Sequence, residues 1–422
     1  MPHQLGVTIR APVAPGRAAE LRDWLAEVAR KGLAEGPFDF GHLHGLHFAK
    51  LYLLDEAADA DGQQIPATLV FMSEVDAPLQ RHLTELIDLA GEGIDQAFRY
   101  CTGYPGPDAH RRTRIAWLRR HMIPASAFYV NTVGRGLEQI RQEAMLRDAL
   151  EEYLDKRDWA AHTATEIRRE LRAYVAGNPD LAWARKPPPP PSLRFRAGEA
   201  AHMVAVPLVL APFLPVLLLV LPAWALLLWL DELRDRPFTE RPTLRHLQEV
   251  GDYEDFVTQN PFAVVGFLKT GWLRQLTART VFFLTDYGVR HIFTHDSLAG
   301  VKTIHFARWV PIDGWRRMTF ATNYDGAVEA YNDDFINIIS WGLNATFSNA
   351  RDYPPTRLLF FLGAKLEEQF KATIRCHQVP VPAWYTAYPE LSADNIQNNA
   401  QIRAGLRGDM SPAQAEQWLS LL

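Results

Sequence analysis

The chain has 422 residues, of which 48% are hydrophobic and 22% are charged, and this composition is typical of folded domains rather than of disordered chains. The net charge of -5 provides no basic surface for a polyanion, which excludes nucleic acid as a partner. The two cysteines, Cys101 and Cys376, lie in no CxxC pattern, which excludes a disulfide framework and favours a reducing compartment.

The first part of the chain alternates strand and helix patterns. Residues 7–13 predict a strand, and residues 17–33 predict an amphipathic helix with Leu21, Trp24 and Leu25 on one face. Strands follow on both sides of the polar loop 57–67, and then come a helix from about Leu83 to Tyr100 and a last strand at 127–132. This order of elements is that of a ferredoxin-like unit.

The middle of the chain contains three segments of different composition. A charged helix is expected at about 158–176. The run KPPPPP at 186–191 predicts an extended polyproline spacer. Residues 203–230 then contain no charged, amide or hydroxyl side chain. A bilayer span needs about 20 such residues, so this segment predicts a membrane location. The N-terminus shows no secretory signal pattern, so we expect the internal apolar segment to direct the protein to the membrane.

Four prolines interrupt the apolar segment: Pro207, Pro212, Pro215 and Pro222. A straight helix of this length would reach about 42 Å, against about 30 Å of hydrocarbon. Each proline also removes a backbone donor and disfavours a continuous helix. The sequence therefore favours a re-entrant hairpin whose halves each enter one leaflet, with a single span as the alternative.

Basic residues set the expected orientation. Arg185, Lys186, Arg194 and Arg196 precede the segment, so the preceding flank should be cytoplasmic. Residues 260–284 mix Lys and Arg with Phe, Trp and Leu, and this pattern predicts either an interfacial surface or a buried strand and helix.

The two flanks of the apolar segment are copies of one another. The spacing is 258 residues between His47 and His305, 249 between Asp76 and Asp325, and 256 between the equivalent histidines of RRHMIP and RCHQVP. We divide the chain into a first repeat, a charged helix with a polyproline linker, the membrane segment, a connector, a second repeat and a C-terminal tail, at 1–152, 153–202, 203–230, 231–261, 262–412 and 413–422.

The repeat also predicts how the sheets pack. A ferredoxin-like sheet buries only the face that its helices cover, so the open faces of two copies should pack together as in a dimeric α/β barrel. The expected fold class is thus α+β, with two ferredoxin-like repeats in a barrel-like unit and a proline-broken membrane-embedded helical segment. A re-entrant segment places both repeats on the cytoplasmic side, whereas a single span would separate them.

Paired polar residues are the candidates for chemistry. A histidine can transfer protons or ligate a metal, so His47, His305, His121 and His377 could ring a site between the copies, or they could be structural. Asp76 and Asp325 stand where a strand turns into a helix, a favoured place for a capping carboxylate.

Two arginines belong to the same candidate set. Arg119 and Arg375 could hold an anionic group or form surface salt bridges. No dinucleotide-binding glycine motif, P-loop, serine-nucleophile elbow or zinc-protease motif occurs in the sequence.

The double ferredoxin-like layout resembles the superfamily of chlorite dismutases and dye-decolorizing peroxidases. Thr322-Asn323-Tyr324-Asp325-Gly326 is similar to the peroxidases' Gly-x-x-Asp-Gly motif, with Thr322 in place of the first glycine. The resemblance implies a haem between the repeats, with Asp325 as proton shuttle, Arg375 as anion stabiliser and His305 or His377 as iron ligand. His121, Arg119 and Tyr385 would complete the cofactor pocket.

The sequence thus suggests two functions. The first is a membrane-attached, haem-dependent, peroxidase-like oxidoreductase that acts on a peroxide or a lipid-derived apolar substrate. The alternative is a non-enzymatic lipid-binding or membrane-interaction module. In both cases the expected partners are the lipid bilayer and an apolar or lipid-derived small molecule, and a homo-oligomer is left open.

Overall fold

The computed structural model describes residues 3–59 and 61–422 and shows an α+β protein with two four-stranded antiparallel sheets. The first sheet has the order β1-β5-β2-β12, and the second has the order β6-β8-β9-β7. These strands are β1 (Gln4–Pro12), β2 (Leu46–Leu54), β5 (Thr68–Asp76), β6 (Ala127–Val130), β7 (Gln259–Phe267), β8 (Ile304–Ile312), β9 (Arg317–Asp325) and β12 (Ala383–Thr386).

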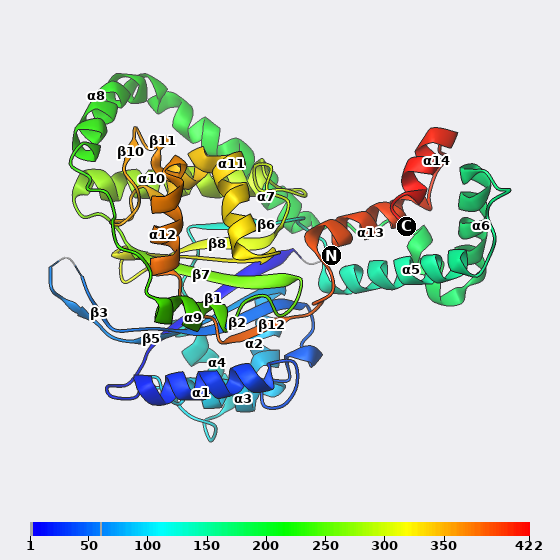
Figure 1. Ribbon diagram of the computed structural model, residues 1–422. Helices are drawn as coiled ribbons and strands as arrows, with labels where there is room; N and C mark the ends of the chain where they lie inside the picture. Colours follow the sequence, from blue (N-terminus) through cyan, green and yellow to red (C-terminus); the bar gives the residue numbers. More distant parts are fainter. Residues whose placement is uncertain (1–2, 60) are drawn as a thin grey trace.

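The sheets lie face to face between two layers of helices (Figure 1). The helices of the first repeat cover one sheet: α1 (Ala18–Lys31), α2 (Leu79–Asp88), α3 (Gly91–Phe98) and α4 (Arg111–Arg120). Those of the second repeat cover the other: α10 (Trp272–His291), α11 (Val328–Phe347) and α12 (Glu367–His377). Alternation along β2 explains this layering, because Leu51 packs on the helix side and Tyr52 packs against the second sheet. The helix expected at 83–100 is two helices, α2 and α3.

The duplicated arrangement expected from the sequence is present, but each repeat contributes its last strand to the other sheet. In sequence order, β6 belongs to the first repeat and pairs with β8 of the second. Likewise β12 belongs to the second repeat and pairs with β2 of the first. The expectation that the strand at 127–132 completes its own sheet is therefore wrong. Periodicity identifies a strand but does not specify which edge it pairs with.

The chain reaches the other sheet by way of its own. Just before β6, Arg10 and Ile123 donate backbone hydrogen bonds to His121 and Thr8, so this segment runs beside β1. Before β12, Val379 donates in the same way to Ala263 of β7. Each last strand thus begins beside the first strand of its own repeat and ends in the partner sheet, which ties the two repeats together.

Two buried cations cross between the sheets at equivalent positions. Lys50 Nζ donates to the Thr322 carbonyl at 2.8 Å, and Arg308 Nη2 donates to the Ser73 carbonyl at 2.9 Å. Arg308 also pairs with the buried Glu74, whereas Lys50 has no carboxylate in direct contact among the described hydrogen bonds and ion pairs. Burial lowers the pKa of Lys50 to about 7, although Glu74 acts in the opposite direction.

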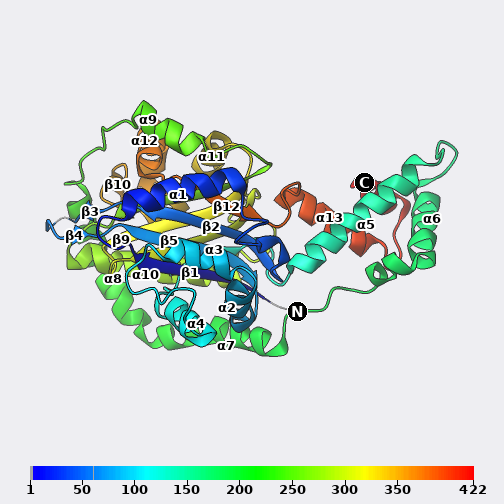
Figure 2. The ribbon, with the colours of Figure 1, turned by 90° about the horizontal axis from the view of Figure 1, so that it is seen from below.

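A helical arm projects away from the sheets (Figures 1 and 2). It contains α5 (Leu137–Asp155), α6 (Ala164–Gly177), the 3-10 helix η2 (Pro179–Arg185), α13 (Ala393–Gly405) and α14 (Pro412–Leu419). Leu150, Leu171, Ile402 and Trp418 share one apolar cluster. The segment that follows the first repeat and the C-terminal tail therefore pack together with the last helix of each repeat.

The apolar segment is helical throughout. It consists of α7 (Leu193–Leu210), a 3-10 turn η3 (Ala211–Phe213) and α8 (Leu214–Glu232), which together form one arch beside α10 (Figure 1). Residues 210, 211, 213 and 214 all keep right-handed helical dihedrals. The reversal that a helical hairpin requires is absent from residues 203–230, so the expected hairpin geometry is wrong.

The remaining elements are short. They are η1 (Phe40–His42), β3 (Ala57–Ala58), β4 (Gln64–Ile65), α9 (Leu244–Gly251), β10 (Thr356–Arg357), β11 (Phe361–Leu362) and η4 (Gly363–Lys365).

Lys50 predicts how stability depends on pH. The unfolded chain binds a proton at Lys50 up to about pH 10.4, whereas the folded chain releases it near pH 7. The free energy of unfolding should therefore rise between pH 7 and pH 10, because the unfolded state then binds more protons. Substitution Lys50→Met should reduce this rise in urea unfolding experiments, whereas Lys31→Met, at an exposed ion pair, should not. Identical pH profiles for Lys50→Met and the parent would contradict this account.

Candidate functional site

Two histidines stand at equivalent irregularities of the two sheets. The register of β2 against β5 shifts between Leu46 and Phe48, and that of β8 against β9 shifts between Ile304 and Phe306. His47 and His305 are therefore the extra residues of two β-bulges. A bulge bends the strand and re-aims its side chain, and both histidines line the same small cavity between the repeats.

Each histidine contacts the aspartate of its own repeat. His305 Nε2 lies 2.7 Å from Asp325 Oδ1, and His47 Nε2 lies 3.2 Å from Asp76 Oδ1. The second carboxylate oxygen accepts a backbone N–H at a helix start, from Ala393 at 2.7 Å for Asp325 and from Leu137 at 2.9 Å for Asp76. A carboxylate is favoured there by the unpaired N–H groups and by the helix dipole.

The aspartates therefore cap helices, as expected, but not the helices that follow them in sequence. They cap α5 and α13, each of which follows the exchanged last strand of the same repeat. Each exchanged strand, β6 or β12, thus pairs in the other sheet. The helix that follows it, α5 or α13, is capped by the aspartate of its own repeat. This contact is long-range, so local sequence pattern did not predict it.

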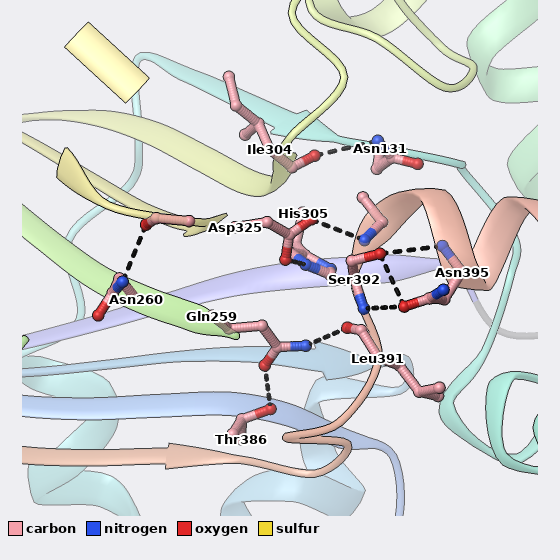
Figure 3. Close-up of polar contacts among 12 residues, drawn as sticks. Asn131, Gln259, Asn260, Ile304, His305, Asp325, Thr386, Leu391, Ser392 and Asn395 are labelled. Carbon is pink, nitrogen blue, oxygen red and sulfur yellow. Dashed lines mark hydrogen bonds and ion pairs between the residues drawn. The ribbon is translucent and has the colours of Figure 1, made fainter. Parts of the chain in front are cut away.

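Two buried glutamines lie near the pairs and were not identified from the sequence. Gln4 donates to Asp76 at 3.1 Å and to the Arg135 carbonyl at 2.8 Å. Gln259 donates to the Leu391 carbonyl at 2.5 Å and accepts a hydrogen bond from Thr386 (Figure 3). Both glutamines stand at the first position of a first strand, so extending the repeat alignment to these strands would have found them.

The space beside the histidines is small. The cavity that His47 and His305 line has a volume of about 30 Å³, which suits water rather than a substrate. His47 Nδ1 also contacts the Tyr388 hydroxyl at 3.2 Å. Burial, with Asp76 and Glu74 adding to it, raises the pKa of Tyr388 well above its ordinary value, so the hydroxyl keeps its proton. This arrangement fixes the strand ends and helix starts.

The other two candidate histidines lie at helix C-termini. His121 Nδ1 is 2.8 Å from the Trp117 carbonyl on α4, and His377 Nδ1 is 2.9 Å from the Thr373 carbonyl on α12. Because α4 and α12 lie in opposite outer layers, the four histidines do not ring one site (Figure 1). Histidines near a helix C-terminus commonly bind its last carbonyls.

Arg375, Arg119 and Tyr385 lie apart from the histidine–aspartate pairs. Arg375 forms ion pairs with Glu254 and Glu329, and Arg119 donates to Gln80 at the surface. Tyr385 packs in the first-repeat core. Of the seven site residues that the resemblance implies, only His305 and Asp325 are in contact in the structure.

The residues present do not fit a haem. Burial opposes a proton on His377, but its hydrogen bonds with Asp352 and the Thr373 carbonyl outweigh burial and raise its pKa. Both ring nitrogens are already engaged, Nδ1 with the Thr373 carbonyl at 2.9 Å and Nε2 with Asp352 at 3.0 Å, so neither is free to bind iron. The cavity beside His377 has a volume of about 40 Å³, against about 300–1,000 Å³ for ligand pockets. Within residues 3–59 and 61–422, no cluster of three or more His, Cys, Asp or Glu side chains suits a metal ion.

The second candidate site is the arch formed by α7, η3 and α8, and its two ends are bound to the second repeat. Near its start, Glu199 pairs with Arg290 at 2.6 Å, and His202 Nδ1 lies 2.7 Å from His291 Nε2. Near its end, Arg274 Nε donates to Asp231 at 2.5 Å. Polar contacts thus hold both ends of the arch to α10.

The middle of the arch is exposed to solvent. Every residue from 207 to 223 is exposed, on all sides of the helix, and Leu219 reaches 81% exposure. Residues 193–232 form the one helix of the described chain that is long and apolar enough to cross a membrane. The arch therefore combines an uncovered apolar middle with ends fixed to a folded domain.

Fold and site define the class as a duplicated α+β protein with exchanged last strands and one long exposed apolar helix. Comparisons of the chain with known protein families, curated proteins and solved structures find no match. The resemblance to haem peroxidases therefore rests on the sequence pattern, and the comparisons identify no family.

Asp325 tests whether the histidine–aspartate pairs are structural. Removing its carboxylate in Asp325→Ala leaves the start of α13 and His305 without their partner, which should lower the free energy of unfolding by about 2–3 kcal/mol. Asp333→Ala removes an exposed carboxylate paired with Lys371 and serves as control, with an expected change of about 0–1 kcal/mol. Urea unfolding of the full chain in detergent measures both variants. Equal midpoints for Asp325→Ala and the parent would contradict the structural role.

Proposed function

We propose that this protein is a membrane-interaction module that residues 207–223 hold on one face of a bilayer. The observation that carries the proposal is exposure on every side of an apolar helix. A helix that is apolar all round is stable in a protein core or in lipid, and no other part of the described chain covers this one. Burying a Leu or Phe side chain contributes about 1.5–3 kcal/mol, so immersion of the helix is strongly favourable.

The helix has no polar face, and this argues for immersion below the headgroups. An interfacial amphipathic helix keeps a charged face in water, whereas residues 207–223 carry no charged, amide or hydroxyl side chain. A helix also pairs most of its own N–H and C=O groups in lipid, and only the four prolines at 207, 212, 215 and 222 lack a donor. The first charged or imidazole groups on either side, such as His202 and Asp231, already contact the second repeat.

The proposed arrangement is monotopic. Because both ends of the arch are bound to α10, the helix enters and leaves by the same leaflet as an arch rather than as a hairpin. The exchanged strands then keep the first repeat on the same side as the second. The basic residues Arg185, Lys186, Arg194 and Arg196 support a cytoplasmic location for that side.

Further exposed apolar side chains of the second repeat support the same face. They lie on α10, on α11 and in the β10–β11 hairpin, and include Trp272, Leu276, Phe283, Leu284, Trp341 and Phe361. The sequence at 260–284 predicted either an interfacial surface or a buried strand and helix. In the structure β7 is largely buried, whereas α10 is exposed along one side. The oxidoreductase alternative would gain support from a Soret band when haem is added to the purified protein.

Leu218 tests the proposal because it is 61% exposed in the middle of the arch. An arginine near the centre of a bilayer costs about 2.5–3.5 kcal/mol, so Leu218→Arg should lower vesicle binding about 100-fold. Liposome flotation measures the bound fraction. The control is Leu89→Arg, an exposed leucine of the first repeat, which should float as the parent does.

Two outcomes would count against membrane binding. If Leu218→Arg floats like the parent, the arch is not the anchor. If the parent stays soluble without lipid as a defined oligomer that Leu218→Arg dissociates, the arch packs against a second copy of the chain instead.

A further inference from the structure

A second apolar element projects beside the end of the arch. It is the β10–β11 hairpin, with the sequence Thr-Arg-Leu-Leu-Phe-Phe-Leu at residues 356–362. Its side chains are exposed to 46% at Phe360, 63% at Phe361 and 44% at Leu362. Three adjacent exposed large apolar residues are unusual on a surface that meets water.

Three leucines of the hairpin have positive φ angles, which leucine rarely adopts. Leu358, Leu359 and Leu362 have φ angles of +51°, +65° and +64°. A side chain disfavours this left-handed region, and such residues persist where the surrounding structure holds them. The contacts around the hairpin should therefore explain its shape.

Glu232 holds the hairpin from one side. It is fully buried and is the last residue of α8. Its carboxylate accepts the backbone N–H groups of Leu358 at 2.5 Å and Leu359 at 3.0 Å, together with the Thr356 hydroxyl at 2.8 Å. The end of the arch and the hairpin are thus joined through one side chain.

Asn344 of α11 holds the hairpin from the other side. Its amide nitrogen donates to the carbonyls of Phe360 and Leu362, each at 2.9 Å. Its oxygen accepts from the Tyr353 hydroxyl and from Ala364 N. Two buried polar side chains therefore use their hydrogen-bonding capacity to fix the backbone of an exposed apolar loop.

We propose that hairpin 356–362 is a second membrane-inserting element, held at the same depth as the end of the arch by Glu232. Phe360, Phe361 and Leu362 insert among the acyl chains. Arg357 and Lys365 flank them, and this charge pattern matches the phosphates of anionic lipids. The inference rests on the membrane location proposed for the arch, and it adds a separate point of insertion and its coupling to α8.

Fluorescent labels at three positions test the proposal in the full chain. Cysteines are introduced one at a time as Phe361→Cys, Leu217→Cys and Leu89→Cys in a Cys376→Ser background, because Cys101 is buried and Cys376 is partly exposed. Each is labelled with an environment-sensitive dye and mixed with vesicles of phosphatidylcholine and phosphatidylglycerol. Labels at 361 and 217 should shift to the blue and lose emission when the lipids carry brominated acyl chains, whereas the label at 89 should not respond.

The outcomes separate this inference from the proposed function. A response at 217 without one at 361 overturns the hairpin and leaves the arch in place. No response at either position overturns both, and responses at all three positions indicate non-specific adsorption and also overturn the hairpin.

Substitution Glu232→Gln tests the coupling. A glutamine has one acceptor oxygen and two N–H donors, so it does not replace a carboxylate that accepts three hydrogen bonds. The blue shift at 361 should be lost in Glu232→Gln, whereas the shift at 217 should persist. An unchanged shift at 361 would show that Glu232 does not set the depth of the hairpin.

Discussion

The structure depends on one constraint, which is that both ends of the apolar helix are bound to the same domain. Glu199 and His202 hold its start to α10, and Asp231 holds its end. A helix bound at one end is free to cross a bilayer, whereas a helix bound at both ends to one repeat returns its chain to the side from which it left. The topology proposed for the whole protein follows from these contacts.

Strand exchange extends the same constraint to the first repeat. Strands β6 and β12 each pair with the opposite sheet, and Lys50 and Arg308 cross between the sheets, so each sheet contains strands of both repeats. The histidine–aspartate pairs reinforce the strand exchange, since their aspartates cap the helices that follow the exchanged strands. In a larger cavity, these histidines and aspartates could transfer protons. Here they bind strand ends and helix starts, and this structural role favours the membrane-interaction function over the oxidoreductase.

The sequence predicted much of the fold and less of the site. Its internal repeat placed the strands and paired His47 with His305 and Asp76 with Asp325, because duplication preserves spacing. It did not predict the strand exchange, since alternation specifies faces and not partners. Nor did it predict the arch: Pro212 and Pro215 lie in the first turns of η3 and α8, where the N–H that proline lacks has no helical partner.

The most direct test of the central claim is the accessibility of the two repeats in sealed vesicles. Protein inserted from one side is treated with a protease, and antibodies against residues 1–152 and 262–412 detect protected fragments. We predict that both repeats are digested together in intact vesicles. Digestion of one repeat with protection of the other would show that the apolar helix crosses the bilayer, and it would contradict the monotopic arrangement.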